Sequence, residues 1–106
     1  MTSVTSRLYY DAHLLIIEGH AGSAEKGRDL VCAAVSALAV TLVACLRDRE
    51  ADGQVILRRC VVRDGYVCVE AAPATEDEEP LRAVFETVVT GLRLLADCYP
   101  DYVRMD

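Results

Sequence analysis

Two residues in the first third of the chain have side chains that could cleave a peptide bond together. His20 lies in the stretch GHAG and Cys32 in the stretch DLVCAAVSAL, with a glycine-containing loop between them. A thiolate is a strong nucleophile, and an imidazole can take its proton and later protonate the leaving amine. The same residue types also occur as an inert core cysteine and an ordinary loop histidine, so spacing alone leaves both interpretations open.

The predicted position of Cys32 favours reactivity. Asp29 is a good N-cap residue, so we expect a helix that begins at Leu30 and holds Cys32 in its first turn. The partial positive charge at a helix N-terminus stabilises a thiolate there. The other four cysteines fall in expected strands or near the C-terminal ends of expected helices, where this stabilisation is absent.

Three more residues could support the pair. Gly19 leaves room for a substrate backbone beside His20. Asp29 caps the expected helix, orients His20, or does both. Ser36 lies one helical turn after Cys32 on the same face, where it lines a substrate groove or simply allows close packing.

These residues must be positioned by the elements around them. Apolar periodicity and turn signals predict strands over 4–9, 14–18, 55–62 and 66–71, and helices over 30–49 and 79–97. Asp64-Gly65 predicts a tight hairpin between the last two strands. His13 falls in an expected turn and receives no role. We therefore predict one α+β domain over residues 1–106, a two-layer sandwich with a mostly antiparallel sheet and two helices.

The composition narrows the class of protein. The chain has 106 residues, 53% of them hydrophobic, which suits one compact domain. Seventeen acidic residues against eleven basic ones give a net charge of −6. That charge argues against direct nucleic-acid binding, which needs a basic surface, and is compatible with a basic partner.

Cysteine usage and hydropathy predict the cellular compartment of the protein. The N-terminal stretch MTSVTSRLYY has no apolar segment of a signal peptide, and an odd number of cysteines, five, favours reduced thiols in the cytoplasm. No CxxC pair occurs, so we expect no metal or cofactor. The uncharged run 30–46 is interpreted as a buried helix rather than a membrane span. Its apolar surface exceeds what one sheet can cover, which predicts a homodimer.

The residues around His20 and Cys32 resemble the signature of the ribosomal-processing cysteine protease family, Prp. The matching run is GHAG…KGRDLVCAAVSAL, in which Leu30 replaces the usual isoleucine. The segment GLRLL from Gly91 and the ending YPDYVRM also resemble the last helix and the tail of that family. The resemblance therefore extends over the whole chain.

The resemblance implies a function and a site. Members of the family are bacterial cytoplasmic endopeptidases that form homodimers and remove an N-terminal extension from large-subunit ribosomal protein twenty-seven during ribosome assembly. His20 and Cys32 match the family's catalytic pair. Gly19, Asp29 and Ser36 match positions associated with the site and its substrate. The glycine-containing loop, Ala21 to Arg28, matches a mobile segment that must open to admit the peptide.

Two other functions are compatible with the sequence. One is a non-catalytic, dimeric, ribosome-associated binding module of the same fold, in which Cys32 would react with alkylating agents no faster than a free thiol. The other is a thiol redox sensor, which needs a resolving cysteine, and none is adjacent to Cys32 in the sequence.

Overall fold

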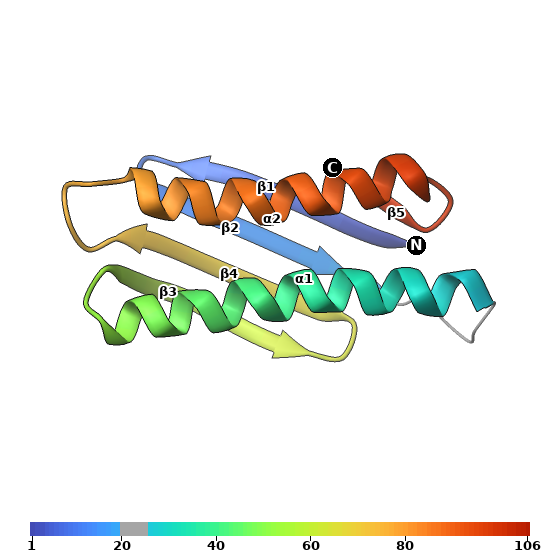
Figure 1. Ribbon diagram of the computed structural model, residues 1–106, viewed down its shortest axis with the longest axis horizontal. Coiled ribbons are helices and arrows are strands. Elements are labelled where there is room, and N and C mark those ends of the chain that lie inside the picture. The colour runs from blue at the N-terminus through green and yellow to red at the C-terminus, as the bar shows by residue number, and fades with distance from the viewer. Residues whose placement is uncertain (20–25) are drawn as a thin grey trace.

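The computed structural model (Figure 1) describes the backbone of residues 1–19 and 26–106 and the side chains of residues 1–19 and 30–106. In chain order the elements are β1 (Thr2–Tyr9), β2 (Ala12–Glu18), α1 (Lys26–Ala51), β3 (Val55–Arg63), β4 (Tyr66–Pro73), α2 (Glu79–Cys98) and β5 (Val103–Met105). The first six elements follow the predicted order.

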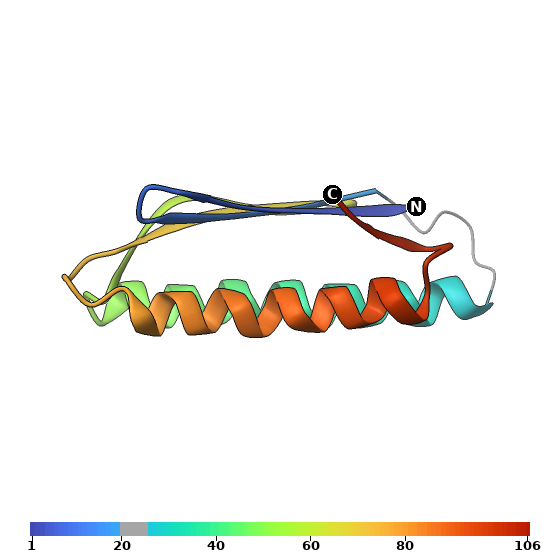
Figure 2. The same cartoon turned by 90° about the horizontal axis from the view of Figure 1, so that it is seen from above.

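The strands form one sheet in the order β3-β4-β2-β1-β5. All neighbouring pairs are antiparallel except β1 and β5, which are parallel. Both helices lie on one face of this sheet, so the molecule has two layers (Figure 2). The predicted α+β sandwich is confirmed, and β5 is an addition to it.

The turn of one hairpin lies where the sequence predicted it, and the turn of the other differs from the prediction. Asp64-Gly65 joins β3 to β4 as predicted, and Gly65, with a φ of 73°, has the positive φ while Asp64 does not. The β1–β2 turn consists of Tyr10, with a φ of 55°, and Asp11, and β2 begins at Ala12. The prediction of a turn at His13 was therefore wrong: His13 lies in β2, paired with Leu8 of β1.

Helix α1 begins at Lys26, not at Leu30 as predicted. Asp29 is therefore not the N-cap, and Cys32 lies in the second turn rather than the first. The prediction treated Gly27 as a loop residue. A helical glycine costs only about 1 kcal/mol relative to alanine, and Lys26 and Arg28 on either side are good helix formers.

The core lies between the sheet and the helices. Its largest fully buried side chains come from both layers, and they are Val4, Leu15, Leu42, Leu46, Val69, Leu81, Leu92 and Val103. Along α2 the buried residues recur at helical spacing, as predicted for one apolar face. The core thus fixes the position of both helices on the sheet.

The run Leu30–Ala51 in α1 is long and apolar enough to cross a membrane by length and composition. In this structure its buried side chains, such as Val35, Ala39 and Leu42, pack in the core with the sheet. The core helix of a soluble domain passes the same test of length and hydropathy. Only 33% of the most apolar window of this run is buried inside the molecule, so α1 packs on the sheet with one side and is not the fully buried helix that the sequence predicted.

Candidate active site

Cys32 is half-buried and lines a cleft of about 160 Å³. One wall belongs to α1, which contributes Cys32, Val35, Ser36 and Ala39. The opposite wall comes from the sheet and contains Thr2, Ile17 and Val67. The rim is formed by Gly19 and by residues 63–66 at the β3–β4 turn. The cleft therefore lies where the end of β2, the start of β1 and the β3–β4 turn meet α1.

Cys32 is the only one of the five cysteines that lines this cleft. Cys45 lies further along α1, on a groove between the two helices, and Cys68 is buried in β4. All five are free thiols. Among the described residues, Cys32 is therefore the thiol that a peptide bound in this cleft could reach.

The position of Cys32 changes the electrostatic argument made from the sequence. The stabilisation that a helix N-terminus gives an anion falls off within the first turn, and Cys32 lies beyond it. The backbone N–H of a second-turn residue is also committed to the helix, so it is not free to receive an oxyanion. The helix N-terminus is therefore not the source of thiol activation that the sequence predicted.

Ser36 lines the cleft one turn after Cys32, and its side chain is exposed. Both residues therefore face the cavity from the same helix, as their spacing requires. A hydroxyl beside the thiol can donate a hydrogen bond to a bound peptide or accept one from it.

Gly19 joins the end of β2 to the rim of the cleft. It has a φ of 112°, and a Cβ built there would overlap the carbonyl oxygen of Met1. Its N–H donates a 3.0 Å hydrogen bond to the carbonyl of Gly65 in the β3–β4 turn. The backbone is thus pinned on two sides directly before His20, and only glycine fits.

His20 and the loop 21–25 lie outside the described residues, as does the side chain of Asp29. The backbone of Asp29 lies in the first turn of α1. The segment 26–28, predicted as part of the loop, is helical instead. The structure describes the backbone of the two residues that flank this segment, Gly19 and Lys26.

Sequence reasoning missed the contribution of the β3–β4 turn to the cleft. Arg63, Asp64, Gly65 and Tyr66 line it because β4 pairs with β2, which brings this turn beside Gly19. The Asp-Gly signal located the turn along the chain. The pairing of β2 with β4, which joins segments about fifty residues apart, has no local signal in the sequence.

Tyr66 has a raised pKa. The largest cause is its side-chain hydrogen bond with Cys68, followed by the charge interaction with Cys68, desolvation and the nearby Glu18. The Arg63 guanidinium lies 4.9 Å from the centre of the Tyr66 ring and acts in the opposite direction. The phenol therefore stays protonated at neutral pH, which argues against Tyr66 as the base for Cys32.

Comparisons with known proteins agree with this fold and show the family. The profile of the family described as Cysteine protease Prp matches residues 1–104. The structure of SMU.848 from Streptococcus mutans is similar, with 31% sequence identity and a TM-score of 0.72, over 100% of this chain and 92% of that one. No curated protein matches the chain.

Two structures of a protein described as an essential ribosomal processing protease Prp from S. aureus share the fold. One has a covalently linked product peptide, with 22% identity, and the other has a substrate peptide, with 18% identity. Both have a TM-score of 0.74 and cover 100% of this chain and 98% of theirs. With the family match over nearly its full length and a cysteine-lined cleft, the chain belongs to the Prp family of cysteine proteases.

Proposed function

We propose that this cysteine protease is an endopeptidase that removes the N-terminal extension of large-subunit ribosomal protein twenty-seven during ribosome assembly. The observation that carries the proposal is the cleft itself, in which Cys32 of α1 faces the strands at the point where β2 leads into His20. The S. aureus relative, described as a ribosomal processing protease, supports the choice of substrate.

Cys32 is the nucleophile and His20 its base in this proposal. His20 takes the thiol proton, and the sulfur forms a bond to the scissile carbonyl carbon. When the resulting tetrahedral species collapses, the carbon–nitrogen bond breaks and His20 gives the proton to the leaving amine. Water then attacks the thioester, His20 takes its proton, and the thiol is restored as the carboxylic acid leaves.

The supporting residues divide the remaining tasks. Gly19 fixes the backbone beside His20, and Ser36 contacts the peptide from the same wall as Cys32. Asp29, in the first turn of α1, orients the imidazole. Because Cys32 lies beyond the reach of the helix N-terminus, the imidazole supplies most of the activation of the thiol.

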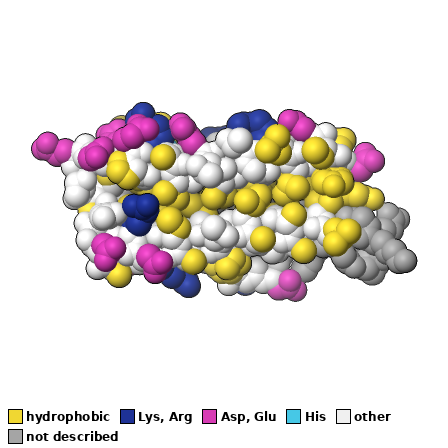
Figure 3. Space-filling view, viewed as in Figure 1, with side chains coloured by type: hydrophobic (Ala, Val, Ile, Leu, Met, Phe, Trp, Pro, Cys, Tyr) yellow, Lys and Arg dark blue, Asp and Glu magenta, His cyan; other side chains and the backbone are white. Residues whose placement is uncertain are grey.

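We also propose that two copies pair through the helical layer. Apolar side chains run between α1 and α2 on the face opposite the sheet (Figure 3). Val40 is 56% exposed and Leu30 is 74% exposed, and Ala33, Ala37 and Ala44 are also exposed on α1. A second copy would remove this apolar surface from water.

Charge and thiol chemistry fit a cytoplasmic bacterial enzyme. A net charge of −6 attracts a basic ribosomal protein and disfavours direct contact with nucleic acid. The five free thiols suit a reducing compartment. The proposed reaction needs neither a metal nor a cofactor, and it requires no membrane.

Cleavage of a peptide that spans the extended N-terminus of the ribosomal protein tests the function. We expect wild-type protein to cleave it and Cys32→Ala to lose at least about a thousandfold in kcat/KM, because the nucleophile is gone. Cys45→Ala is the matched control: it removes another half-buried thiol of α1, and we expect activity within about twofold of wild type.

Mass spectrometry of the products locates the cut and checks that one peptide bond is hydrolysed. Equal turnover by wild type and Cys32→Ala, or no turnover by either, would defeat the assignment. Loss of activity in both cysteine variants would indicate a structural effect along α1 instead.

A further inference from the structure

Thr2 is the one polar residue that is buried among those the structure describes, with 4% of its surface exposed. It belongs to β1 and lines the cleft opposite Cys32 and Ser36. Its neighbour along the face is Val4, which is fully buried in the core between the sheet and the helices. Because alternate residues of a strand share a face, the Thr2 side chain faces the helical layer too.

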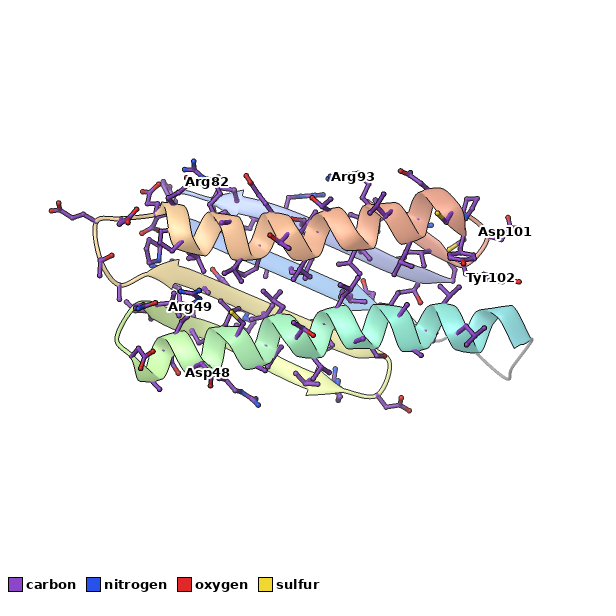
Figure 4. All side chains as sticks on the ribbon, in the orientation of Figure 1. Asp48, Arg49, Arg82, Arg93, Asp101 and Tyr102 are labelled. Carbon is purple, nitrogen blue, oxygen red and sulfur yellow. The ribbon has the colours of Figure 1, made fainter. Side chains whose placement is uncertain are left out.

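The backbone of Thr2 is held firmly on both sides. Its N–H donates a 2.9 Å hydrogen bond to the carbonyl of Tyr102, which lies near the end of α2 (Figure 4). Its Cα pairs with Val103 of β5, and a Cβ on Gly19 would lie 3.4 Å from the Thr2 Cα. The side chain is therefore presented to the cleft from a fixed position.

The Thr2 hydroxyl makes no hydrogen bond within the described residues, although the backbone N–H does. Among the described residues the one buried side-chain polar atom without a partner is Arg49 Nε, so the Thr2 hydroxyl is accessible from the cleft, and valine has the same shape without a hydroxyl. A threonine at the cleft wall thus has a polar group that is not used for folding.

We propose that Thr2 is a substrate-binding residue whose hydroxyl hydrogen-bonds a main-chain amide of the peptide beside Cys32. This inference rests on the proposed peptidase function and adds a contact from the sheet wall. Thr2 and Ser36 then hold the peptide from opposite sides of the cleft, so that the scissile carbonyl lies against the Cys32 sulfur. The main chain is the common feature of any peptide, and a hydroxyl can donate to its carbonyl or accept from its N–H.

Equilibrium binding of the fluorescently labelled extension peptide tests this contact. The measurement uses full-length protein with Cys32→Ala, so that binding is not confused with turnover. We expect Thr2→Val to raise Kd about fivefold, the effect of losing one neutral hydrogen bond, and Thr2→Ser to stay within about twofold of the parent. Thr5→Val is the matched control, because Thr5 pairs with Ile16 in β2 and does not line the cleft.

The melting temperature of each variant accompanies the binding data. A purely structural role for Thr2 would lower the melting temperature of Thr2→Val, whereas our proposal leaves it equal or higher. If Thr2→Val does not fold, Thr2→Ala and Thr2→Ser form a second pair that differs by the same hydroxyl. The same roughly fivefold ratio is then expected between them.

The outcomes separate this inference from the proposed function. An unchanged Kd for Thr2→Val, or equal Kd values for the alanine and serine variants, overturns the role of Thr2. Failure of the parent to bind the peptide overturns both proposals. Binding that depends on the Thr2 hydroxyl, together with no cleavage by protein that retains Cys32, supports the Thr2 contact and overturns only the proposed catalysis.

Discussion

At the residue scale, the site depends on a backbone position that only one amino acid can occupy. Gly19 approaches the carbonyl of Met1 too closely for any Cβ, and its φ of 112° strains other residues. From the sequence alone, Gly19 was expected to leave room for the substrate backbone. The structure adds that Gly19 is required by the close approach of β1 and by its hydrogen bond to Gly65.

Gly19→Ala is expected to reduce both stability and activity. The positive φ and the overlap with Met1 together cost about 1–3 kcal/mol of unfolding free energy, and the shifted strand end displaces His20. Urea unfolding and kcat/KM for the extension peptide measure the two effects.

Gly53→Ala is the control for this change. Gly53 also has a positive φ, 75°, but a Cβ there would meet nothing within 4 Å. It should lose some stability and keep its activity. If Gly19→Ala behaves no differently from Gly53→Ala, the close approach to Met1 has no role in the site.

At the element scale, local signals predicted well and long-range pairings did not. The Asp64-Gly65 turn and the apolar face of α2 follow from neighbouring residues, and both were located correctly. The start of α1 was missed because one helical glycine was given too much weight. The contribution of the β3–β4 turn to the cleft was missed because it depends on the pairing of β2 with β4. The position of His20 relative to Cys32 stays a prediction.

Helix α2 and strand β2 are joined by a titratable contact. The His13 ring stacks on Phe85 with centroids 5.1 Å apart. Desolvation by burial lowers the His13 pKa below its usual 6.5, and Arg82 lowers it further, while Glu86 and Glu78 act in the opposite direction. The folded state therefore favours the neutral imidazole.

This contact predicts that the protein loses stability in mild acid. As the pH falls below 6.5, His13 of the unfolded chain becomes protonated, whereas His13 of the folded chain stays neutral until the pH reaches its lower pKa. The free energy of unfolding therefore decreases as the pH falls from 6.5 to the folded pKa. Above pH 6.5 the contribution of neutral His13 is complete. His13→Phe keeps an aromatic stack but cannot titrate.

Urea unfolding at about pH 7.5 and about pH 5 should therefore show a smaller loss of stability for His13→Phe than for wild type. The same pH dependence in both proteins would mean that other groups, not His13, cause it.

At the scale of the whole molecule, the helical layer has more apolar surface than the sheet covers. The molecule measures 45 × 22 × 16 Å, and the two helices lie side by side along its long axis (Figure 1). From the sequence, only α1 was expected to have apolar surface that the sheet leaves uncovered. A groove of about 370 Å³ between α1 and α2 shows that α2 contributes to this apolar surface too. The proposed homodimer would cover both.

Val40→Glu is expected to convert the dimer to a monomer, because it places a charge among the exposed apolar side chains of α1 in the proposed contact. Ile56→Glu introduces the same charge at a position that is 49% exposed on β3, and it should leave the dimer intact. Sedimentation velocity distinguishes the two states. A monomeric wild type, or dissociation by Ile56→Glu rather than Val40→Glu, would contradict a dimer through the helices.

The parallel pairing of β5 with β1 also has a consequence for biosynthesis. The Arg104 side chain donates a hydrogen bond to the Ser3 hydroxyl across 101 positions, and the Asp106 N–H donates to the carbonyl of Val4. A chain is made from its N-terminus, so β1 is translated long before its outer neighbour exists. The strand that bears Thr2 therefore keeps an open edge in the nascent polypeptide until residues 102–106 emerge, which delays a finished cleft until synthesis of that segment.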